Sequence, residues 1–341
     1  GEVELSNITQ GKVRKTTRID YGAIKQWILP SAKQHKLKNG LPCSETITNI
    51  KEIVEHVKPD IIHIWGTEVY WGLLTARGHI NGNAILEIQG LKYAIEKYFT
   101  AGLSIYDVME CVRLKEVIRP TSSIYANKYD FKRWGEYEKE IIFGHKFIST
   151  QSNWTRYYIK NIKPDAKIYQ NIIPLRSEFL ETDKWVNCKC EQYRIITLAS
   201  NTTTYKGLHV LINAVALLKK RYPNIKLIVA GTVLKKGIKE AGYTKWIKKQ
   251  IKHHALTENI VFVGLLNAEE IILQLKKARV FVQPSFVESY SLALDEALSI
   301  GSPSVVSFSG AMPEMAIHEH SALYFTPGDS VMCANAIERI M

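Results

Sequence analysis

Two glutamates near the end of the chain stand in a pattern that could do chemistry. Glu288 and Glu296 form an E-x7-E pair, set between P-S-x-x-E and G-x-P-x-V-x-S. A carboxylate in such a place can accept hydrogen bonds from vicinal hydroxyls or stabilise an oxocarbenium-like transition state. The spacing alone is weak evidence for a functional site, because glutamates are common on helices and both could be surface carboxylates. The flanking residues make the pattern much more specific.

A cation and two helix starts offer a complementary site for an anion. Lys206-Gly207 ends a polar loop and opens a helix, and residues 289–292 open another. Free amides at a helix N-terminus and a nearby cation both favour a bound phosphate. Taken alone, Lys206 could also be a solvated loop lysine.

The elements that must position these residues alternate between strands and helices. Short β-branched runs separated by helical periodicity predict a parallel sheet covered by helices on both faces. Helices are expected over 208–218, 245–252 and 292–300, the last one ended by Gly301. Ligands of such sheets bind at the carboxyl ends of the strands. The predicted strands are 61–65, 85–88, 146–149, 194–198, 226–230, 260–263, 280–283 and 304–308.

Length and charge limit the possible classes of protein. The 341 residues suggest two domains. We expect them over 1–175 and 193–341, joined by a linker at 176–192, with a cleft between two Rossmann-like sheets. The net charge of +12 favours anionic partners, namely nucleic acid, phosphorylated small molecules or an acidic membrane. No nucleic-acid-binding motif, dinucleotide fingerprint or P-loop accompanies it, so a nucleic-acid partner and a dehydrogenase are disfavoured.

The cysteines and the hydropathy indicate a compartment. No apolar run reaches the length of a transmembrane helix, and no signal peptide is visible. The cysteine count is odd, and the one close pair, Cys188 and Cys190, is too small a ligand set for a zinc site. A reducing cytoplasm and no metal are therefore expected.

The pattern around the glutamates resembles the C-terminal signature of the retaining glycosyltransferases of family 4, which have the GT-B fold. Lys206-Gly207 resembles the K-G of an earlier family motif, and the likeness extends over about residues 58–330. The matching residues of the signature are Pro284, Ser285, Glu288, Leu292, Glu296, Ala297, Gly301, Pro303, Val305, Pro313 and Glu314.

The chain departs from the family pattern in three ways. Asn201 stands where the family has an arginine for the donor diphosphate, so Lys206 or a nearby base would carry more of that role. Ser289-Tyr290-Ser291 replaces Gly-Phe-Gly. No strand with a glycine-rich loop is visible before Pro59, and the chain stops at Met341, so we expect the first strand and the closing helices to be missing.

The resemblance implies transfer of a glycosyl group from a UDP- or GDP-sugar to an acceptor hydroxyl, with retention and without metal or cofactor. Glu288 would contact the donor sugar as the catalytic residue, and Glu296 would accept hydrogen bonds from the ribose. The other donor-side residues implied are Lys206, Asn201, Ser289, Tyr290, Ser291 and Leu292 at the diphosphate, and Gly231, Thr232, Gly264 and Leu265 near the base and ribose.

The acceptor would come from the first half, as a glycan or a lipid-linked glycan in bacterial polysaccharide or capsule synthesis. Trp65 could stack on a sugar or belong to the core, whereas His63 is expected in the core. The lysine-rich face at 245–252 is either a solvated face or a contact with anionic lipid at the inner face of the cytoplasmic membrane. The acceptor-side candidates are Trp65, Gly66, Thr67, Glu68, Gln89 and Gly90.

Two other functions fit the same architecture. A nucleotide-sugar epimerase of the GT-B fold would interconvert epimers of a UDP-sugar and release no UDP. A catalytically inactive, sugar-binding relative is also compatible with the sequence, given Asn201 and the altered loop at 289–291.

Overall fold

The computed structural model describes residues 3–32, 37–113, 116, 123–198, 203–231 and 240–341. The chain divides into two compact units. The first comprises Gly1–Leu91, Trp134–Thr150 and Arg156–Asn171, and the second comprises the remaining segments. Residues 92–133 thus group with the second unit, because Phe99, Val108 and Cys111 pack into its core. The domain boundaries expected from the sequence, 1–175 and 193–341, stay a prediction.

The first unit holds a parallel sheet of order β4-β5-β6-β7 and a smaller sheet of order β1-β3-β2. Helix α1 packs Ile50 and Ile53 against Trp27 and Leu29 of β3. The helices α6 and α7 contribute residues to both units. The elements are β1 Ser6–Gly11, β2 Thr17–Tyr21, β3 Ile24–Pro30, α1 Ser44–Val57, β4 Ile62–Trp65, α2 Trp71–Ala76, β5 Ala84–Glu87, α6 Ile124–Gly144, β6 Phe147–Thr150, α7 Asn153–Ile162 and β7 Lys167–Gln170.

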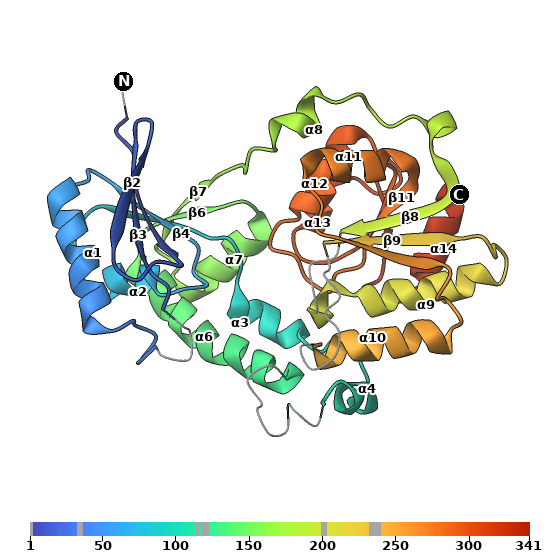
Figure 1. The fold of residues 1–341 in the computed structure, drawn as a ribbon, viewed down its shortest axis with the longest axis horizontal. Helices are drawn as coiled ribbons and strands as arrows, with labels where there is room; N and C mark the ends of the chain where they lie inside the picture. Colours follow the sequence, from blue (N-terminus) through green and yellow to red (C-terminus); the bar gives the residue numbers. More distant parts are fainter. Residues whose placement is uncertain (1–2, 33–36, 114–115, 117–122, 199–202, 232–239) are drawn as a thin grey trace. The chain divides into compact units, whose positions relative to one another are not determined.

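The second unit is built on one parallel sheet of order β10-β9-β8-β11-β12-β13. Figure 1 labels three of its strands, β8, β9 and β11. Its elements are α3 Lys92–Ile95, α4 Ile105–Glu110, α8 Ser177–Glu181, β8 Glu191–Leu198, α9 Leu208–Lys219, β9 Lys226–Ala230, α10 Gly242–His253, β10 Ile260–Gly264, α11 Ala268–Lys277, β11 Ala278–Gln283, α12 Leu292–Ile300, β12 Ser304–Ser307, α13 Met312–Met315, β13 Leu323–Phe325 and α14 Ser330–Ile340, with short 3-10 helices at Glu96–Tyr98, Asn187–Lys189 and Thr204–Lys206.

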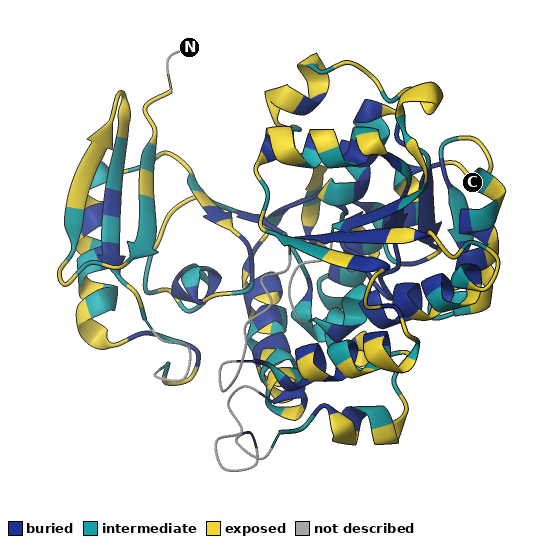
Figure 2. Ribbon diagram, turned by 45° about the vertical axis from the view of Figure 1, so that its right-hand side comes forward, coloured by how far each residue is buried: buried dark blue, intermediate teal, exposed yellow. Residues whose placement is uncertain are grey.

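Both faces of this sheet are buried, as its near-continuous apolar strands require. Ile195 of β8 and Val280 of β11 face a core formed with α9, α10 and α14. Their neighbours Ile196 and Phe281 face the opposite core, formed with α11 and α12. Figure 2 shows the strands of this unit as mostly buried segments with helices around them. The predicted parallel-sheet, Rossmann-like α/β fold is confirmed.

All eight predicted strands and the three predicted helices are present within a few residues of the expected bounds. The strands β1, β2, β3, β7 and β13 were not predicted; β1 and β2 carry many polar residues, and β7 and β13 are short. His63 was expected in the core, and this prediction is wrong. Its side chain is 46% exposed, because it lies on the face of β4 that also carries the exposed Trp65, opposite the buried Ile64.

A glycine contact joins the loop after β8 to the loop after β11, and it gives a test of stability. Gly207 has a φ of 73°, and a Cβ there would lie 1.9 Å from the carbonyl oxygen of Pro284. We expect Gly207→Ala to lower the free energy of unfolding by about 3 kcal/mol, of which the left-handed backbone accounts for about 1–2 kcal/mol. Urea denaturation followed by tryptophan fluorescence measures this loss.

Gly301→Ala is the matched control for this substitution. Gly301 has a φ of 80°, but a Cβ there would meet nothing within 4 Å, so only the backbone strain applies. Equal losses in the two variants would contradict the close approach of Gly207 to Pro284.

Candidate active site at the switch point of the second sheet

The predicted donor residues follow the two strands at which the order of the sheet reverses. The strand β8 lies between β9 and β11, and the connections from β8 and from β11 run toward opposite edges of the sheet. Ligands of open parallel sheets bind outside the carboxyl ends of the strands at this switch point. Lys206 follows β8, and Glu288 follows β11.

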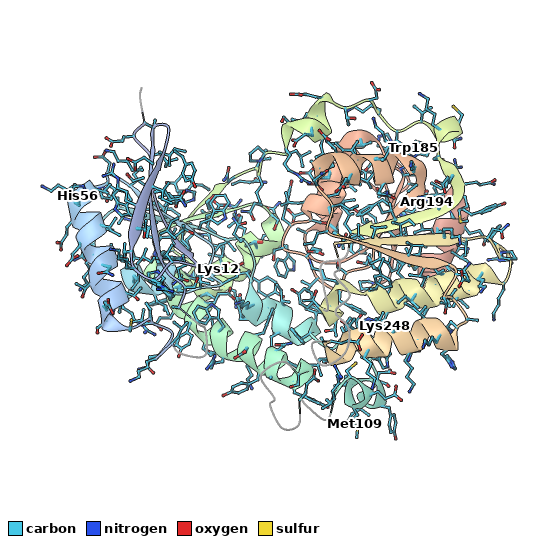
Figure 3. The ribbon with its side chains drawn as sticks, in the orientation of Figure 1. Lys12, His56, Met109, Trp185, Arg194 and Lys248 are labelled. Atoms are coloured by element: carbon cyan, nitrogen blue, oxygen red, sulfur yellow. The ribbon has the colours of Figure 1, made fainter. Side chains whose placement is uncertain are left out.

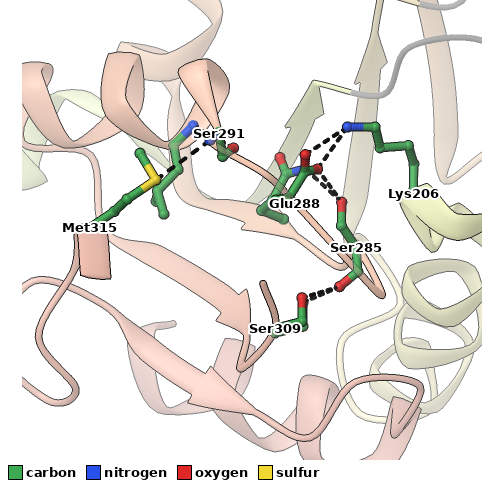
Figure 4. Close-up of polar contacts among 9 residues, drawn as sticks. Lys206, Ser285, Glu288, Ser291, Ser309 and Met315 are labelled. Atoms are coloured by element: carbon green, nitrogen blue, oxygen red, sulfur yellow. Dashed lines mark hydrogen bonds and ion pairs between the residues drawn. The ribbon is translucent and has the colours of Figure 1, made fainter. Parts of the chain in front are cut away.

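Lys206 and Glu288 form a largely buried ion pair. The ammonium nitrogen of Lys206 lies 2.8 Å from each carboxylate oxygen of Glu288, and the two side chains are 24% and 6% exposed. Figure 4 shows the carboxylate of Glu288 between Lys206 and Ser285. Burial alone would lower the pKa of Lys206, but the charge of Glu288, with a contribution from Tyr205, outweighs it and raises this pKa above its ordinary value. Lys206 is therefore a fixed cation.

Two further side chains hold the carboxylate of Glu288. Its Oε1 accepts hydrogen bonds from Ser285 Oγ at 2.7 Å and from Gln283 Nε2 at 2.9 Å. Ser309 donates to the carbonyl of Ser285 at 2.8 Å. A Cβ at Gly310 would lie 2.1 Å from the carbonyl oxygen of Glu288, so only glycine fits beside this loop. Sequence analysis missed Gln283, although it ends a predicted strand directly before the P-S-x-x-E motif.

The predicted anion site at 289–292 lies at the start of α12. Ser291 caps this helix by accepting from the amide of Leu294 at 3.3 Å. The amide of Ser291 points at the sulfur of Met315 at 3.5 Å, a weak acceptor that a stronger anion could replace. Tyr290 donates to Asp295 at 2.7 Å; burial, and then this bond, raise the pKa of the Tyr290 phenol, which stays protonated.

The loop before α12 is tied to a segment that sequence analysis did not connect with it. Ser152 donates to the carbonyl of Ser289 at 2.7 Å. Glu314, the glutamate of the matched P-E pair, accepts from the amides of Asn153 and Trp154 at 2.7 and 2.8 Å. All of these residues belong to the second unit. Glu314 thus caps the N-terminus of α7.

Glu296, the second glutamate of the pattern, meets a cation from the predicted linker. Its Oε1 accepts from Arg176 Nη2 at 2.7 Å. Burial raises the pKa of Glu296, and the charge of Arg176 opposes part of this rise. Sequence analysis missed Arg176, because no periodicity or motif marks residues 176–192.

The remaining donor-side candidates are placed in part. Gly231 donates its amide to the carbonyl of Gly264 at 2.7 Å, so the ends of β9 and β10 meet there, and Leu265 beside them is exposed. Asn201 and Thr232 lie outside the described residues. No group of three or more His, Cys, Asp or Glu side chains that could hold a metal ion occurs in the described part of the chain, and the expectation of no metal stays a prediction.

The acceptor-side candidates lie together in the first unit. Gly66 donates its amide to Glu87 at the end of β5, and a Cβ on Gly66 would lie close to the side chains of Glu68 and Gln89. Thr67 is fully buried and donates to Glu138 at 2.7 Å, with the carbonyl of Gly90 at 3.2 Å. Thr67 therefore has a structural role.

Trp65, at the end of β4, differs from the other acceptor-side candidates in its exposure. It is 58% exposed, so its ring is available to a ligand and is not part of the core.

The lysine-rich face of α10 is partly neutralised. Lys248 pairs with Glu240, and Lys249 pairs with Glu110. Figure 3 labels Lys248 on this helix. Lys245 and Lys252 are exposed. Among the described helices, none has the length and apolar character needed to cross a membrane.

The ion pair predicts a non-additive response to substitution. Lys206→Met leaves the carboxylate of Glu288 buried without its cation, and we expect a loss of about 3 kcal/mol in the free energy of unfolding. The double variant Lys206→Met/Glu288→Gln leaves no buried charge without a partner, so most of the loss in the free energy of unfolding should disappear. A double-mutant cycle by chemical denaturation measures the coupling. Losses that simply add would show that the two side chains do not depend on each other.

Comparison with known proteins gives a family match for the second half of the chain and a shared fold for most of its length. Residues 181–341 match the family model of the glycosyl transferases group 1. An uncharacterized glycosyltransferase of Methanocaldococcus jannaschii, MJ1607, is 26% identical over 148 residues, which cover 43% of this chain and 36% of that protein. The chain spans about a third of the length of the curated relatives it matches.

Two solved structures share the fold at low sequence identity. Sucrose-phosphate synthase from Thermosynechococcus elongatus superposes with a TM-score of 0.74 at 18% identity, over 99% of this chain and 79% of that one. Anabaena Alr3699/HepE in complex with UDP-glucose gives a TM-score of 0.64 at 12% identity, over 98% of this chain and 89% of that one. Residues 181–341, which carry Lys206, Glu288 and Glu296, thus match the glycosyl transferases group 1.

Proposed function

We propose that this protein is a retaining, metal-independent glycosyltransferase of family 4 that uses a nucleotide-sugar donor. The observation that carries the proposal is the buried Lys206–Glu288 pair at the switch point of the second sheet. Support comes from the family match over 181–341 and from the structural neighbour Alr3699/HepE, which was solved in complex with UDP-glucose.

The donor would bind across the carboxyl ends of β8 and β11. Lys206 and the amides that begin α12 would hold the diphosphate, since a cation and a helix N-terminus both favour an anion. Glu288 would accept hydrogen bonds from the sugar hydroxyls. Its Oε1 already accepts from Ser285, Gln283 and Lys206, whereas Lys206 is the one donor to Oε2 among the described residues. Oε2 is therefore the oxygen with room for a sugar.

The reaction would exchange one bond at the anomeric carbon for another. The bond from this carbon to the diphosphate oxygen breaks, the bond to the acceptor oxygen forms on the same face, and the leaving phosphate takes the acceptor proton. Lys206 would stabilise the charge that develops on the leaving diphosphate. Glu288 would stabilise positive charge on the sugar ring, and neither glutamate needs to act as a general base.

The acceptor would be a glycan or a lipid-linked glycan, with the exposed ring of Trp65 as the first candidate contact. A role in polysaccharide or capsule synthesis at the inner face of the cytoplasmic membrane would place Lys245 and Lys252 as the lysines open to anionic lipid. Lys248 and Lys249 are less suited, because both already pair with carboxylates.

Transfer and nucleotide binding test the proposal together. A thermal-shift panel of UDP, GDP and ADP should find one nucleotide that raises the Tm. With the matching nucleotide sugar and a glycan acceptor, Glu288→Gln should lower kcat by about 100-fold or more, because the stabilising carboxylate is lost. EDTA should leave the rate unchanged.

Glu319→Gln is the control, since Glu319 is exposed and pairs with Arg339 away from the site. Full kcat in Glu288→Gln would overturn the assignment of the site. Interconversion of epimers without release of the nucleotide would indicate an epimerase. Binding without turnover would indicate an inactive, sugar-binding relative.

A further inference from the structure

The segment before the second sheet reaches one of the two motif glutamates. Arg176 Nη2 lies 2.7 Å from Glu296 Oε1, and the guanidinium also stands over the ring of Phe179, 4.8 Å from its centroid. The side chain of Glu296 is 11% exposed, whereas that of Arg176 is 44% exposed. The carboxylate is therefore largely enclosed, whereas the arginine side chain reaches the solvent.

The segment that carries Arg176 is fixed to the second unit at several points. Phe179 is fully buried in the core beside α11 and α12. Trp185, labelled in Figure 3, donates its amide to the carbonyl of Ile300 and its indole nitrogen to Ala278, both at 2.8 Å. Lys184 donates to the carbonyl of Ser299 at 2.8 Å. Arg176 is thus held beside α12 by its own segment.

We propose that Arg176 is a positioning residue of the nucleotide site: it fixes Glu296 by one carboxylate oxygen and leaves the other to accept hydrogen bonds from a ribose diol. The inference rests on the proposed function, since it assumes that a nucleotide binds at the switch point. A guanidinium suits the task, because its fork of donors is rigid and always charged.

The contact with Arg176 also explains how the enclosed carboxylate of Glu296 stays ionised and able to accept hydrogen bonds from a neutral diol. A buried carboxylate without a cation tends to take up a proton, and a protonated carboxyl accepts hydrogen bonds from hydroxyls less well. The charge of Arg176 favours the ionised form of Glu296, while the neighbouring Asp295 opposes it. Arg176 should therefore act on the affinity for the ribose and not on the affinity for the diphosphate.

Calorimetry of the full chain with two nucleotides separates these contributions. The probes are UDP, or GDP or ADP if the panel selects it, and the 2′,3′-dideoxy form of the same nucleotide. We expect the wild type to bind the dideoxy form about tenfold more weakly, since hydrogen bonds to a charged group are lost. Arg176→Met should weaken the diol nucleotide about tenfold and leave the dideoxy form unchanged.

Three further variants distinguish the proposed role of Arg176 from a general structural effect of its substitution. Arg176→Lys should restore most of the affinity for the diol, because it restores the charge. In a Glu296→Gln background, Arg176→Met should have no further effect. Lys184→Met is the matched control, since it removes another contact of the same segment with α12 without touching Glu296, and it should leave both affinities unchanged.

The outcomes distinguish this inference from the proposed function. Equal weakening of both nucleotides by Arg176→Met, or no weakening of either, overturns the role of Arg176 and leaves the glycosyltransferase proposal standing. A wild type that does not discriminate the two nucleotides also overturns it. A wild type that binds none of the three nucleotides overturns both proposals.

Discussion

The arrangement of the second unit depends on the contact between Lys206 and Glu288. Taking two charges out of water costs several kcal/mol per ion, and their attraction offsets this only with good geometry and further hydrogen bonds. Ser285 and Gln283 supply those bonds, and the ammonium lies equally close to both carboxylate oxygens. A well-packed apolar pair would be no less stable there. A charged pair at the switch point of a parallel sheet is therefore better explained by a charged ligand than by the needs of the fold.

Close backbone contacts hold together the two loops that carry Lys206 and Glu288. Gly207 approaches the carbonyl of Pro284 at a distance that excludes a Cβ, and Gly310 approaches the backbone of Glu288 in the same way. The amide of Phe286 donates to the carbonyl of Tyr205 at 2.8 Å, so the two loops are also joined directly. The loops after β8 and β11 thus form one surface, on which the cation and the carboxylate have little freedom to move apart.

Burial explains which parts of the molecule could be predicted from the sequence. Strands buried on both faces, such as β9 and β11, are continuous apolar runs and were found within two residues of their bounds. The strands β1 and β2 carry polar, partly exposed residues, and nothing in their sequences distinguishes them from loops. His63 looked like a core residue because its neighbours are apolar, but only one face of β4 is buried, and His63 lies on the other face with Trp65. Lys206 and Glu288 were found through motifs, whereas their contact is a property of the fold.

The contact of Arg176 with Glu296 could not be predicted from sequence motifs. The family match begins at residue 181, so the arginine that contacts the motif glutamate lies just outside it. Its place is set by the burial of Phe179 and by the hydrogen bonds of Trp185, which are long-range contacts with no local signature. A segment that reads as a linker in sequence can therefore supply a charge to a site whose motifs all lie elsewhere. Because that charge acts on Glu296 and not on Glu288, the two glutamates of the E-x7-E pattern are held by different cations, and each can be altered without the other.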